Sequence, residues 1–568
     1  MKKIVSSMLA VMLAIPLFGA AAPASAEKPV KASVSESSTY VRGQEWAITG
    51  FTVNGSNYFS LRDVAEALSG SPSQFDVSYS AAGGSVEILT GRPYTPRTSV
   101  YRGYSGRGTG LAAVPSSSKV LVDGKPQPIT AYNINGSNYF QLRDLAAKVP
   151  FEVEYEPSSN KISLFPKTPE HASRVPGLQV TDDNALTSSF SRWQQPAATT
   201  IVPGSDGSLS VVQAGKTLTV EKYSAAFAPA GKTNIPMELP LFGGFFSGTA
   251  YNYIAFGQSN AEQNDAKEVI RIVRYDKSFN RIDSVSVTGG QSFTIEPFDA
   301  GSGRMAEMGD TLVFHTARKR YKTDDGLNHQ SQLTMIVNTA SMKVTNDLGR
   351  FQANHVSHSF DQYVLFDGAE HVLVDHGDAY PRSIVLNKGN GSDYTEVDLF
   401  NIPGRIGANE TGVSLGGFEM SAGSYIVAMN SVDHSKVKEY TSFEMVGLKV
   451  DQRDIMLAVL PKSNVSAGAA RQVTLAKYTD GSKNASVPKL VKITDNRMMV
   501  LWQEFDLEGR PGDVKMQYID GDGNPSGSIQ SLPGFRLSET QPVVIGGKAV
   551  WFTDTWGARV FYSIPAAG

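Results

Sequence analysis

Residues 498–506 read MMVLWQEFD, an apolar run that becomes polar toward its C-terminal end. Each such segment beyond residue 200 is short, rich in β-branched and aromatic residues, and bounded by Gly, Asn or Asp, as is typical of β-strands separated by turns. Six more segments have this character: SLSVVQAG (208–215), NYIAFGQSN (252–260), TLVFHTARK (311–319), QYVLFDG (362–368), SYIVAMNS (424–431) and AVWFTDTW (549–556). The C-terminal two thirds of the chain is therefore expected to be all-β.

The recurrence of these seven strands predicts a β-propeller, in which similar sheets surround an axis. Less apolar strands that contain a tyrosine and lead into a polar turn accompany them, as in LTVEKYSAAFAPAG (218–231) and VKMQYIDGDGNPSG (514–527). We expect about seven blades, with six or eight as alternatives, and the apolar strands innermost. The last blade looks incomplete, so a strand near Thr199–Pro203 is expected to close the ring. Two β-sandwich domains are the alternative fold.

The N-terminal region contains a duplicated segment. Residues 54–65 read NGSNYFSLRDVA and residues 135–146 read NGSNYFQLRDLA, a period of 81 residues. Asn-Gly between apolar strands predicts a tight hairpin. In the first copy Leu61, Val64 and Leu68 then recur at helical spacing, and Ser60 three residues before Asp63 predicts an N-cap. Each copy is thus a small α+β unit, and the Gly- and Ser-rich residues 97–118 are predicted to form a loop between the copies.

The segment VLVDGKPQPITAYNINGSNYFQLRDLAAKVPFEVEYEPSSNKISLF (120–165) resembles the copper amine oxidase N-terminal-like domain of secreted and surface proteins from Gram-positive, Paenibacillus-like bacteria. The resemblance covers about residues 38–169. It departs from the commoner Val-Pro-Leu-Arg form by placing Tyr-Phe-Ser or Tyr-Phe-Gln before Leu-Arg. It implies a stalk domain that carries neither metal nor quinone. No quinone-forming Asn-Tyr-acid motif with three histidine ligands was found, so we expect neither amine oxidase activity nor a copper or other cofactor.

The N-terminus has the order of a secretory signal: Lys2 and Lys3, an apolar run, and then Ala24-Ser25-Ala26. Cleavage after Ala26 would move the formal charge from −3 to −5, which argues against a nucleic-acid partner. The chain has no cysteine, which excludes disulfides and thiolate chemistry. The expected organisation is a signal peptide (1–26), a stalk domain (27–169, with repeats at about 38–95 and 118–167), a linker (170–203) and a propeller (204–568), with no membrane span after cleavage.

Polar residues at the ends of the apolar strands are candidate ligand-binding groups. If these strands lie around the axis, their ends converge on one mouth, where amides, carboxylates and aromatic rings suit a carbohydrate or peptide. The alternative interpretation is that a propeller mouth is simply polar and hydrated. The candidates are Asn260, His315, Asp367, Asn430, Trp502, Gln503, Glu504, Trp551, Thr553, Asp554 and Trp556.

A second candidate site lies in residues 354–383, where four of the eight histidines fall. Imidazole and carboxylate are good ligands for zinc, nickel or manganese. We expect the hairpin 363–374 to bring this set to one face, either as a metal site or as hydrogen-bonded structural residues. The set is His355, His358, His376, Asp375 and Asp378. DGDGN (520–524) begins like a calcium loop, but Ser531 stands where a bidentate glutamate is required, so a hairpin turn is predicted.

These observations leave three functions open. The leading hypothesis is a secreted or cell-wall-associated binding protein without catalytic activity, in which the stalk is a spacer or wall attachment and the propeller recognises a glycan or protein. The alternatives are a propeller hydrolase or lyase acting on polysaccharide and a purely structural envelope component.

Overall fold

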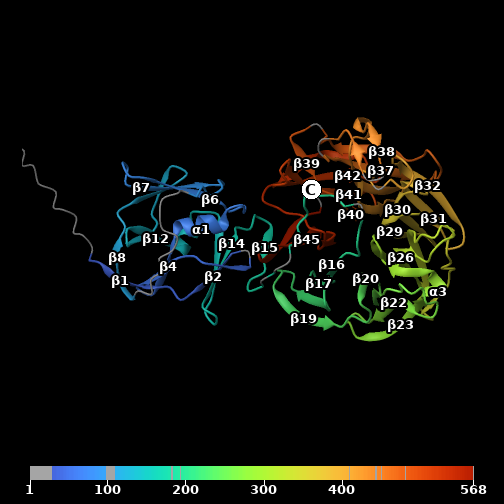
Figure 1. The fold of residues 1–568 in the computed structure, drawn as a ribbon, viewed down its shortest axis with the longest axis horizontal. Helices are drawn as coiled ribbons and strands as arrows, with labels where there is room; N and C mark the ends of the chain where they lie inside the picture. Colours follow the sequence, from blue (N-terminus) through green and yellow to red (C-terminus); the bar gives the residue numbers. More distant parts are fainter. Residues whose placement is uncertain are drawn as a thin grey trace, which may run out of the picture. The chain divides into compact units, whose positions relative to one another are not determined.

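The computed structural model describes residues 28–41, 43–96, 109–178, 180, 183–191, 193–408, 410–441, 444–448, 451–479 and 481–566. The predicted signal peptide lies outside these residues. Contacts divide the chain into two compact units, residues 1–39 with 46–162 and residues 40–45 with 163–568. The predicted fold class is confirmed, because the chain is mainly β, with a small α+β unit and a propeller (Figure 1).

The N-terminal unit is built from two copies of one strand order around a closed six-stranded barrel, β1-β4-β5-β12-β11-β8. Phe59 of the first copy pairs directly with Phe140 of the second. The barrel strands are β1 (Val30–Val34), β4 (Gly50–Val53), β5 (Ser56–Ser60), β8 (Thr109–Pro115), β11 (Ala131–Ile134) and β12 (Ser137–Gln141). Residues 97–108 of the predicted loop 97–118 lie outside the described residues. The prediction is wrong at the end of the loop, since β8 is a strand with the apolar residues Leu111 and Ala113 packed in or against the barrel core.

Two further sheets and two helices complete this region. One sheet has the order β10-β9-β7-β6, in which β7 of the first copy pairs in parallel with β9 of the second, and the other has the order β13-β14-β2-β3. Helix α1 buries Leu61, Val64 and Leu68 as predicted, and the Ser60 hydroxyl accepts a hydrogen bond from the Asp63 amide at 3.4 Å. The elements are β2 (Ser38–Val41), β3 (Gln44–Trp46), α1 (Leu61–Leu68), β6 (Phe75–Ser80), β7 (Ser85–Thr90), β9 (Lys119–Val122), β10 (Lys125–Gln127), α2 (Leu142–Ala146), β13 (Phe151–Glu156) and β14 (Lys161–Pro166).

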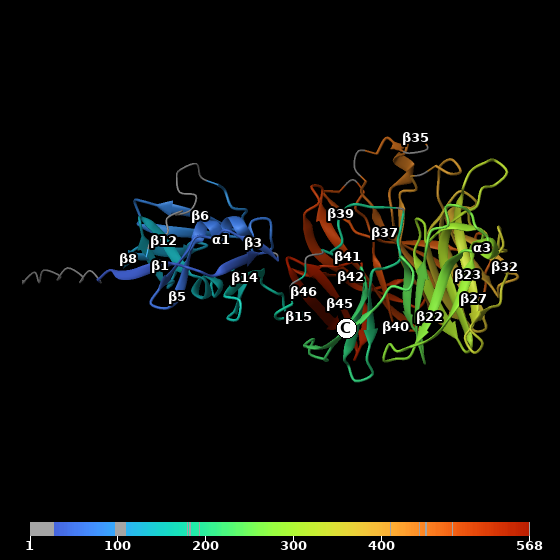
Figure 2. The same cartoon turned by 60° about the horizontal axis from the view of Figure 1, so that its bottom comes forward.

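Seven antiparallel sheets of the described chain surround the axis as blades (Figures 1 and 2). From the innermost strand outward they are blade 1, β16 (Thr199–Pro203), β17 (Leu209–Ala214), β18 (Leu218–Tyr223) and β19 (Pro229–Ile235); blade 2, β20 (Leu241–Ser247), β21 (Asn252–Gly257), β22 (Glu268–Tyr275) and β23 (Arg281–Thr288); blade 3, β25 (Gly303–Met308), β26 (Thr311–Arg320), β27 (Gln330–Asn338) and β28 (Lys343–Val344); and blade 4, β29 (Ser359–Asp367), β30 (Glu370–Asp378), β31 (Arg382–Gly389) and β32 (Tyr394–Asn401).

The other three blades, again from the innermost strand outward, are blade 5, β33 (Val413–Met420), β34 (Ser424–Ser431), β37 (Asp454–Pro461) and β38 (Arg471–Ala476); blade 6, β40 (Lys489–Thr494), β41 (Arg497–Asp506), β42 (Pro511–Asp520) and β43 (Pro525–Leu532); and blade 7, β44 (Val543–Ile545), β45 (Lys548–Thr555), β46 (Ala558–Pro565) and β15 (Ala172–Arg174). The smaller elements are β24 (Thr294–Pro297) and β39 (Lys483–Ala485), which pair with β26 and β41, a hairpin of β35 (Glu439–Tyr440) and β36 (Met445–Val446), α3 (Gly289–Ser292) and the 3-10 turn His434–Lys436.

Ring closure differs from the prediction. The outermost strand of blade 7 is β15, in which Ala172 pairs with Tyr562, whereas Thr199–Pro203 is the innermost strand of blade 1. The predicted linker 170–203 therefore holds two propeller strands. The prediction failed because β15 is a three-residue polar strand whose partner lies almost at the other end of the sequence, so no local pattern marks it.

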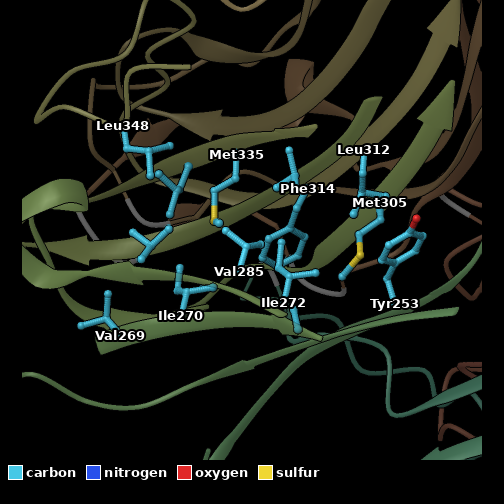
Figure 3. Close-up of a cluster of buried hydrophobic side chains, with 14 of the residues drawn as sticks. Tyr253, Val269, Ile270, Ile272, Val285, Met305, Leu312, Phe314, Met335 and Leu348 are labelled. Atoms are coloured by element: carbon cyan, nitrogen blue, oxygen red, sulfur yellow. The ribbon is translucent and has the colours of Figure 1, made fainter. Parts of the chain in front are cut away.

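The apolar segments are mostly second strands and not innermost ones. Second strands such as β45 are buried along nearly their whole length because both of their faces pack against neighbouring blades. Figure 3 shows such packing between blades 2 and 3, where Ile272 and Phe314 meet in one core. Of the seven segments, only QYVLFDG lies in an innermost strand.

Glycines mark the innermost strands instead, because neighbouring strands approach one another closely at the axis. A Cβ on Gly303 would overlap the carbonyl oxygen of Gly243, and one on Gly416 would overlap that of Pro488. Only glycine allows so close an approach of two backbones.

Candidate functional site

The predicted mouth residues are mostly at one face of the ring. Innermost strands begin where second strands end, and we call this side the strand-start face. Asn260 follows β21, and Asn430, Glu504 and Asp554 lie near the ends of β34, β41 and β45. Asp367 ends the innermost strand β29, so it lies on the opposite face, contrary to the prediction.

Asp554 is hydrogen-bonded within the protein, at the place where blade 7 meets blade 1. Its carboxylate accepts two hydrogen bonds from Arg559, at 2.7 and 2.6 Å. The Arg559 guanidinium, 1% exposed, also donates to Glu221 and to the Tyr223 hydroxyl of β18. Arg559 lowers the pKa of Glu221 against the effect of burial. This ion-pair network joins the two ends of the ring.

Other predicted mouth residues join neighbouring blades in the same way. The Asn260 amide donates to the Tyr321 hydroxyl at 3.0 Å, which links blades 2 and 3. The Tyr478 hydroxyl, beyond β38, donates to Glu504 at 2.9 Å and accepts from the Trp502 indole at 2.7 Å, which links blades 5 and 6. These side chains are buried and hydrogen-bonded within the protein.

The remaining candidates also have internal roles. Asn430 accepts from Arg453 at 3.4 Å, and Gln503 accepts from the Leu537 amide at 3.1 Å. The Trp551 indole donates to a backbone carbonyl, the Thr553 hydroxyl lies 3.4 Å from that of Tyr562, and Trp556 sits in the turn after β45 with φ 57°.

Asp367 forms a joint on the opposite face. It pairs with Lys462 at 3.0 Å and Lys388 at 3.2 Å and accepts from the Tyr425 hydroxyl, so it connects blades 4 and 5. These partners lower its pKa to about 2 although burial opposes the shift. The predicted ring of ligand groups is therefore largely a set of joints between blades.

The five predicted metal ligands are not one group. Asp378 lies 2.9 Å from the His358 ring, because the β29–β30 hairpin returns the chain to its start, but His376 bonds to the Thr411 hydroxyl at 3.1 Å. Asp375 is held by His315 at 3.0 Å and the Ser359 hydroxyl at 2.6 Å, another joint between blades 3 and 4.

His355 packs against Phe351, and burial lowers the pKa of His355 to about 4. Within the described ranges, no three His, Cys, Asp or Glu side chains are arranged to hold a metal ion. The metal interpretation is therefore wrong for these residues, because Asp375, His376 and the His358–Asp378 pair are held by different partners and do not face one common point.

The loop 520–524 is a hairpin turn. One oxygen of Asp520 accepts from the amides of Asp522 at 2.9 Å and Asn524 at 2.8 Å, and the other accepts from the Asn524 side chain. Asp276 makes the same bonds to Ser278 and Asn280 in blade 2, which identifies a repeated turn.

Charged side chains that the sequence analysis did not select gather at the ring axis. Arg304 of blade 3 lies over the Tyr363 ring of blade 4 at 4.9 Å. Lys489 of blade 6 influences the pKa of Asp361 in blade 4, and Arg304 in turn lowers the pKa of Lys489. Arg304, Asp361 and Lys489 lie on the innermost strands β25, β29 and β40 of three different blades, and these strands surround the ring axis (Figure 1).

Two polar atoms of this axis cluster have no hydrogen-bond partner among the described residues: Oδ1 of Asp361 and Nε of Arg304. Lys489 donates to the Glu539 carbonyl at 2.8 Å. Burial raises the pKa of Asp361 to about 6, although Arg304 and Lys489 oppose this, and burial lowers that of Lys489. Buried polar atoms in native proteins are nearly always satisfied, so these two require an explanation.

Glu419 and Lys492 lie on the neighbouring innermost strands β33 and β40, and Lys492 itself forms an ion pair with Asp495 at 2.7 Å. Burial raises the pKa of Glu419 in β33 to about 7 against the influence of Lys492 in β40. The sequence signal that could have found both sets is a charged residue directly beside the crowded glycines, as in GSGR (301–304) and GGFE (416–419).

Comparisons with known proteins found structural similarity at low sequence identity. No family model and no curated protein matches the chain. Among solved structures, a GH43 protein, BlXynB, from Bacillus licheniformis is similar over 64% of this chain and 59% of its own, at 10% identity and a TM-score of 0.26. A structure from a study of two prolyl endopeptidases is similar over 66% and 48%, at 11% identity and a TM-score of 0.36. This chain thus spans about half to three fifths of those proteins. None of the described helices is long and apolar enough to cross a bilayer.

Proposed function

We propose that this chain is an exported binding protein without catalytic activity, whose propeller holds an acidic group of a glycan or protein at the ring axis. The observation that carries the proposal is that Arg304, Asp361 and Lys489 lie on the innermost strands of three blades and that Asp361 Oδ1 and Arg304 Nε are buried without a hydrogen-bond partner among the described residues. A bound ligand would supply the missing partners. The resemblance of the N-terminal region to stalk domains favours a role for that region in spacing or wall attachment.

The charge balance favours an anionic ligand. Arg304 and Lys489 are cationic groups, whereas Asp361 and Glu419 have pKa values raised toward neutrality and so are partly protonated at pH 7. A ligand carboxylate would accept from the cations and from a protonated carboxyl, and charge-assisted hydrogen bonds of this kind are among the strongest.

Titration calorimetry of the full chain with oligogalacturonate, and with an acidic peptide as a second probe, tests the proposal. Lys489→Met should weaken binding at least tenfold. Lys548→Met, at an exposed lysine of β45, is the matched control and should bind like the wild type. Equal affinity in the two variants, or no binding of either probe, would overturn the proposal and favour a structural role.

A polysaccharide hydrolase or lyase is the second candidate, because Asp361 and Glu419 have raised pKa values of about 6 and 7. A carboxyl group protonated near neutral pH can serve as a general acid. Release of reducing sugar from acidic or neutral polysaccharides by the wild type, and its loss in both Asp361→Asn and Glu419→Gln, would establish this function in place of binding alone.

A further inference from the structure

The N-terminal unit contains a cleft of 380 Å³ between its two copies. The first copy contributes the start of α1, including Arg62 and Asp63, and Tyr79 of β6, while the second contributes Ser118 and the β11–β12 hairpin around Asn138. This volume is within the range of sites for small ligands, about 300 to 1,000 Å³.

The two copies make equivalent backbone hydrogen bonds at this place, but one turn has an asparagine where the other has a glycine. In the turn between β13 and β14, the carbonyl of Asn160 accepts a hydrogen bond from the Ser38 amide. In the turn between β6 and β7, the carbonyl of Gly84 accepts the corresponding bond from the Lys119 amide. Both residues have positive φ, 50° at Asn160 and 57° at Gly84. Gly84 is therefore the counterpart of Asn160.

In the second copy the Asn160 side chain occupies the space beside this turn. Its oxygen accepts from the Ser37 hydroxyl at 2.8 Å and from the Tyr155 hydroxyl at 3.2 Å. Ser118 is the counterpart of Ser37, 81 residues later, and a Cβ on Gly84 would meet nothing within 4 Å. The cleft is therefore open at the place where the other copy has an asparagine.

The lining offers polar atoms without partners. The Ser118 hydroxyl accepts from Asn138 at 3.2 Å, as Ser37 accepts from Asn57 at 3.1 Å, but it lacks the acceptor that Asn160 provides to Ser37. Tyr139 is 7% exposed, and its hydroxyl is not hydrogen-bonded to any described residue.

We infer that this cleft binds a neutral, hydroxyl-rich saccharide. Hydroxyl and amide side chains both donate and accept, which matches the mixed donors and acceptors of sugar hydroxyls. They line the cleft at Ser60, Ser78, Ser118, Asn133, Asn135 and Asn138. Tyr79, 53% exposed, provides an aromatic face on which the apolar side of a sugar ring can pack. The single cationic and single acidic side chains, Arg62 and Asp63, give no preference for a charged ligand. This inference is independent of the propeller site.

Calorimetry of the full chain with chitotetraose and with cellotetraose tests the inference, and the two probes separate N-acetylated wall-type sugars from plain glucans. We expect at least one probe to bind. Gly84→Asn, which places an asparagine at a φ that asparagine tolerates, should weaken binding at least tenfold while the circular dichroism spectrum and melting temperature are retained. The reverse exchange, Asn160→Gly, should leave affinity within about twofold of the wild type.

A second pair of variants tests the aromatic contact. Tyr79→Ala should abolish saccharide binding, whereas Tyr155→Ala, at the equivalent position of the other copy, should not. Lys489→Met should leave saccharide binding unchanged, which separates this site from the propeller axis. Absence of binding by both saccharides, or equal effects of Gly84→Asn and Asn160→Gly, would overturn the inference.

Discussion

Replacing Arg559 by methionine should strongly destabilise the propeller. The guanidinium is 1% exposed and balances two carboxylates, those of Asp554 and Glu221. Removing one partner of a buried ion pair leaves an uncompensated charge and costs about 3–5 kcal/mol. Lys232, 3.2 Å from Glu221, retains part of the balance there, so the isolated charge falls mainly on Asp554.

Urea unfolding of the full chain, followed by tryptophan fluorescence, measures the loss, since Trp502 and Trp551 are fully buried in the blades. Arg510→Met is the control, because the Arg510 pair with Asp506 is exposed and such pairs contribute about 1 kcal/mol or less. Arg559→Met/Asp554→Leu should recover part of the loss, because both charges are removed together.

The pH dependence gives an independent check. In the wild type the lowered pKa of Glu221 stabilises the fold above the unfolded value of 4.5, and this stabilisation is lost as the pH falls through the lower folded value. In Arg559→Met the isolated carboxylates gain from protonation, so the deficit relative to the wild type should shrink from pH 8 to pH 5. A loss below about 1 kcal/mol at pH 8, or a double variant as unstable as the single one, would refute the reasoning.

Three other outcomes are expected. Asp361→Asn should stabilise the propeller at pH 7.5, because the pKa of Asp361 is about 6 in the folded state and 3.8 in the unfolded state. At about 1.4 kcal/mol per pKa unit the gain is up to about 3 kcal/mol. Urea unfolding midpoints should show that the gain vanishes below pH 4. Burial lowers the pKa of His371 in the folded state to about 4, so its contribution to folding stability is complete above pH 6.5 and is lost as the pH falls toward 4. Over this pH range His371→Gln should therefore lose less stability than the wild type. A fragment starting at residue 167 should give a cooperative melting transition, whereas one starting at residue 194, which lacks β15, should aggregate or melt without cooperativity.

The sequence predicted those parts of the fold that depend on local patterns. The helical spacing of Leu61, Val64 and Leu68, the Ser60 cap and the Asn-Gly hairpins follow from interactions within a few residues, and all are present. The number of blades also followed, because each blade contributes one of the seven apolar segments.

Long-range pairing and the role of polar residues were not predictable in this way. β15 and β46 are neighbours in one blade, but nearly the whole propeller sequence lies between them, and the three residues of β15 show no apolar pattern. Asn260, Glu504 and Asp554 were selected as ligand groups because they are polar and stand at the ends of apolar strands. Sequence alone could not tell whether such a group faces a ligand or the next blade, because that depends on partners such as Tyr321, Tyr478 and Arg559.

The N-terminal barrel has a consequence for how its two copies can change over evolutionary time. Each copy supplies three of six barrel strands, and β7 of one copy lies in the same sheet as β9 of the other. Neither copy can close a core alone, so the duplicated unit resembles a homodimer whose subunits have become covalently joined. Such joining removes the requirement that both halves be identical. One half can then carry a side chain that completes its packing while the other lacks it, as Asn160 and Gly84 do, and the two halves present unlike surfaces on one shared fold.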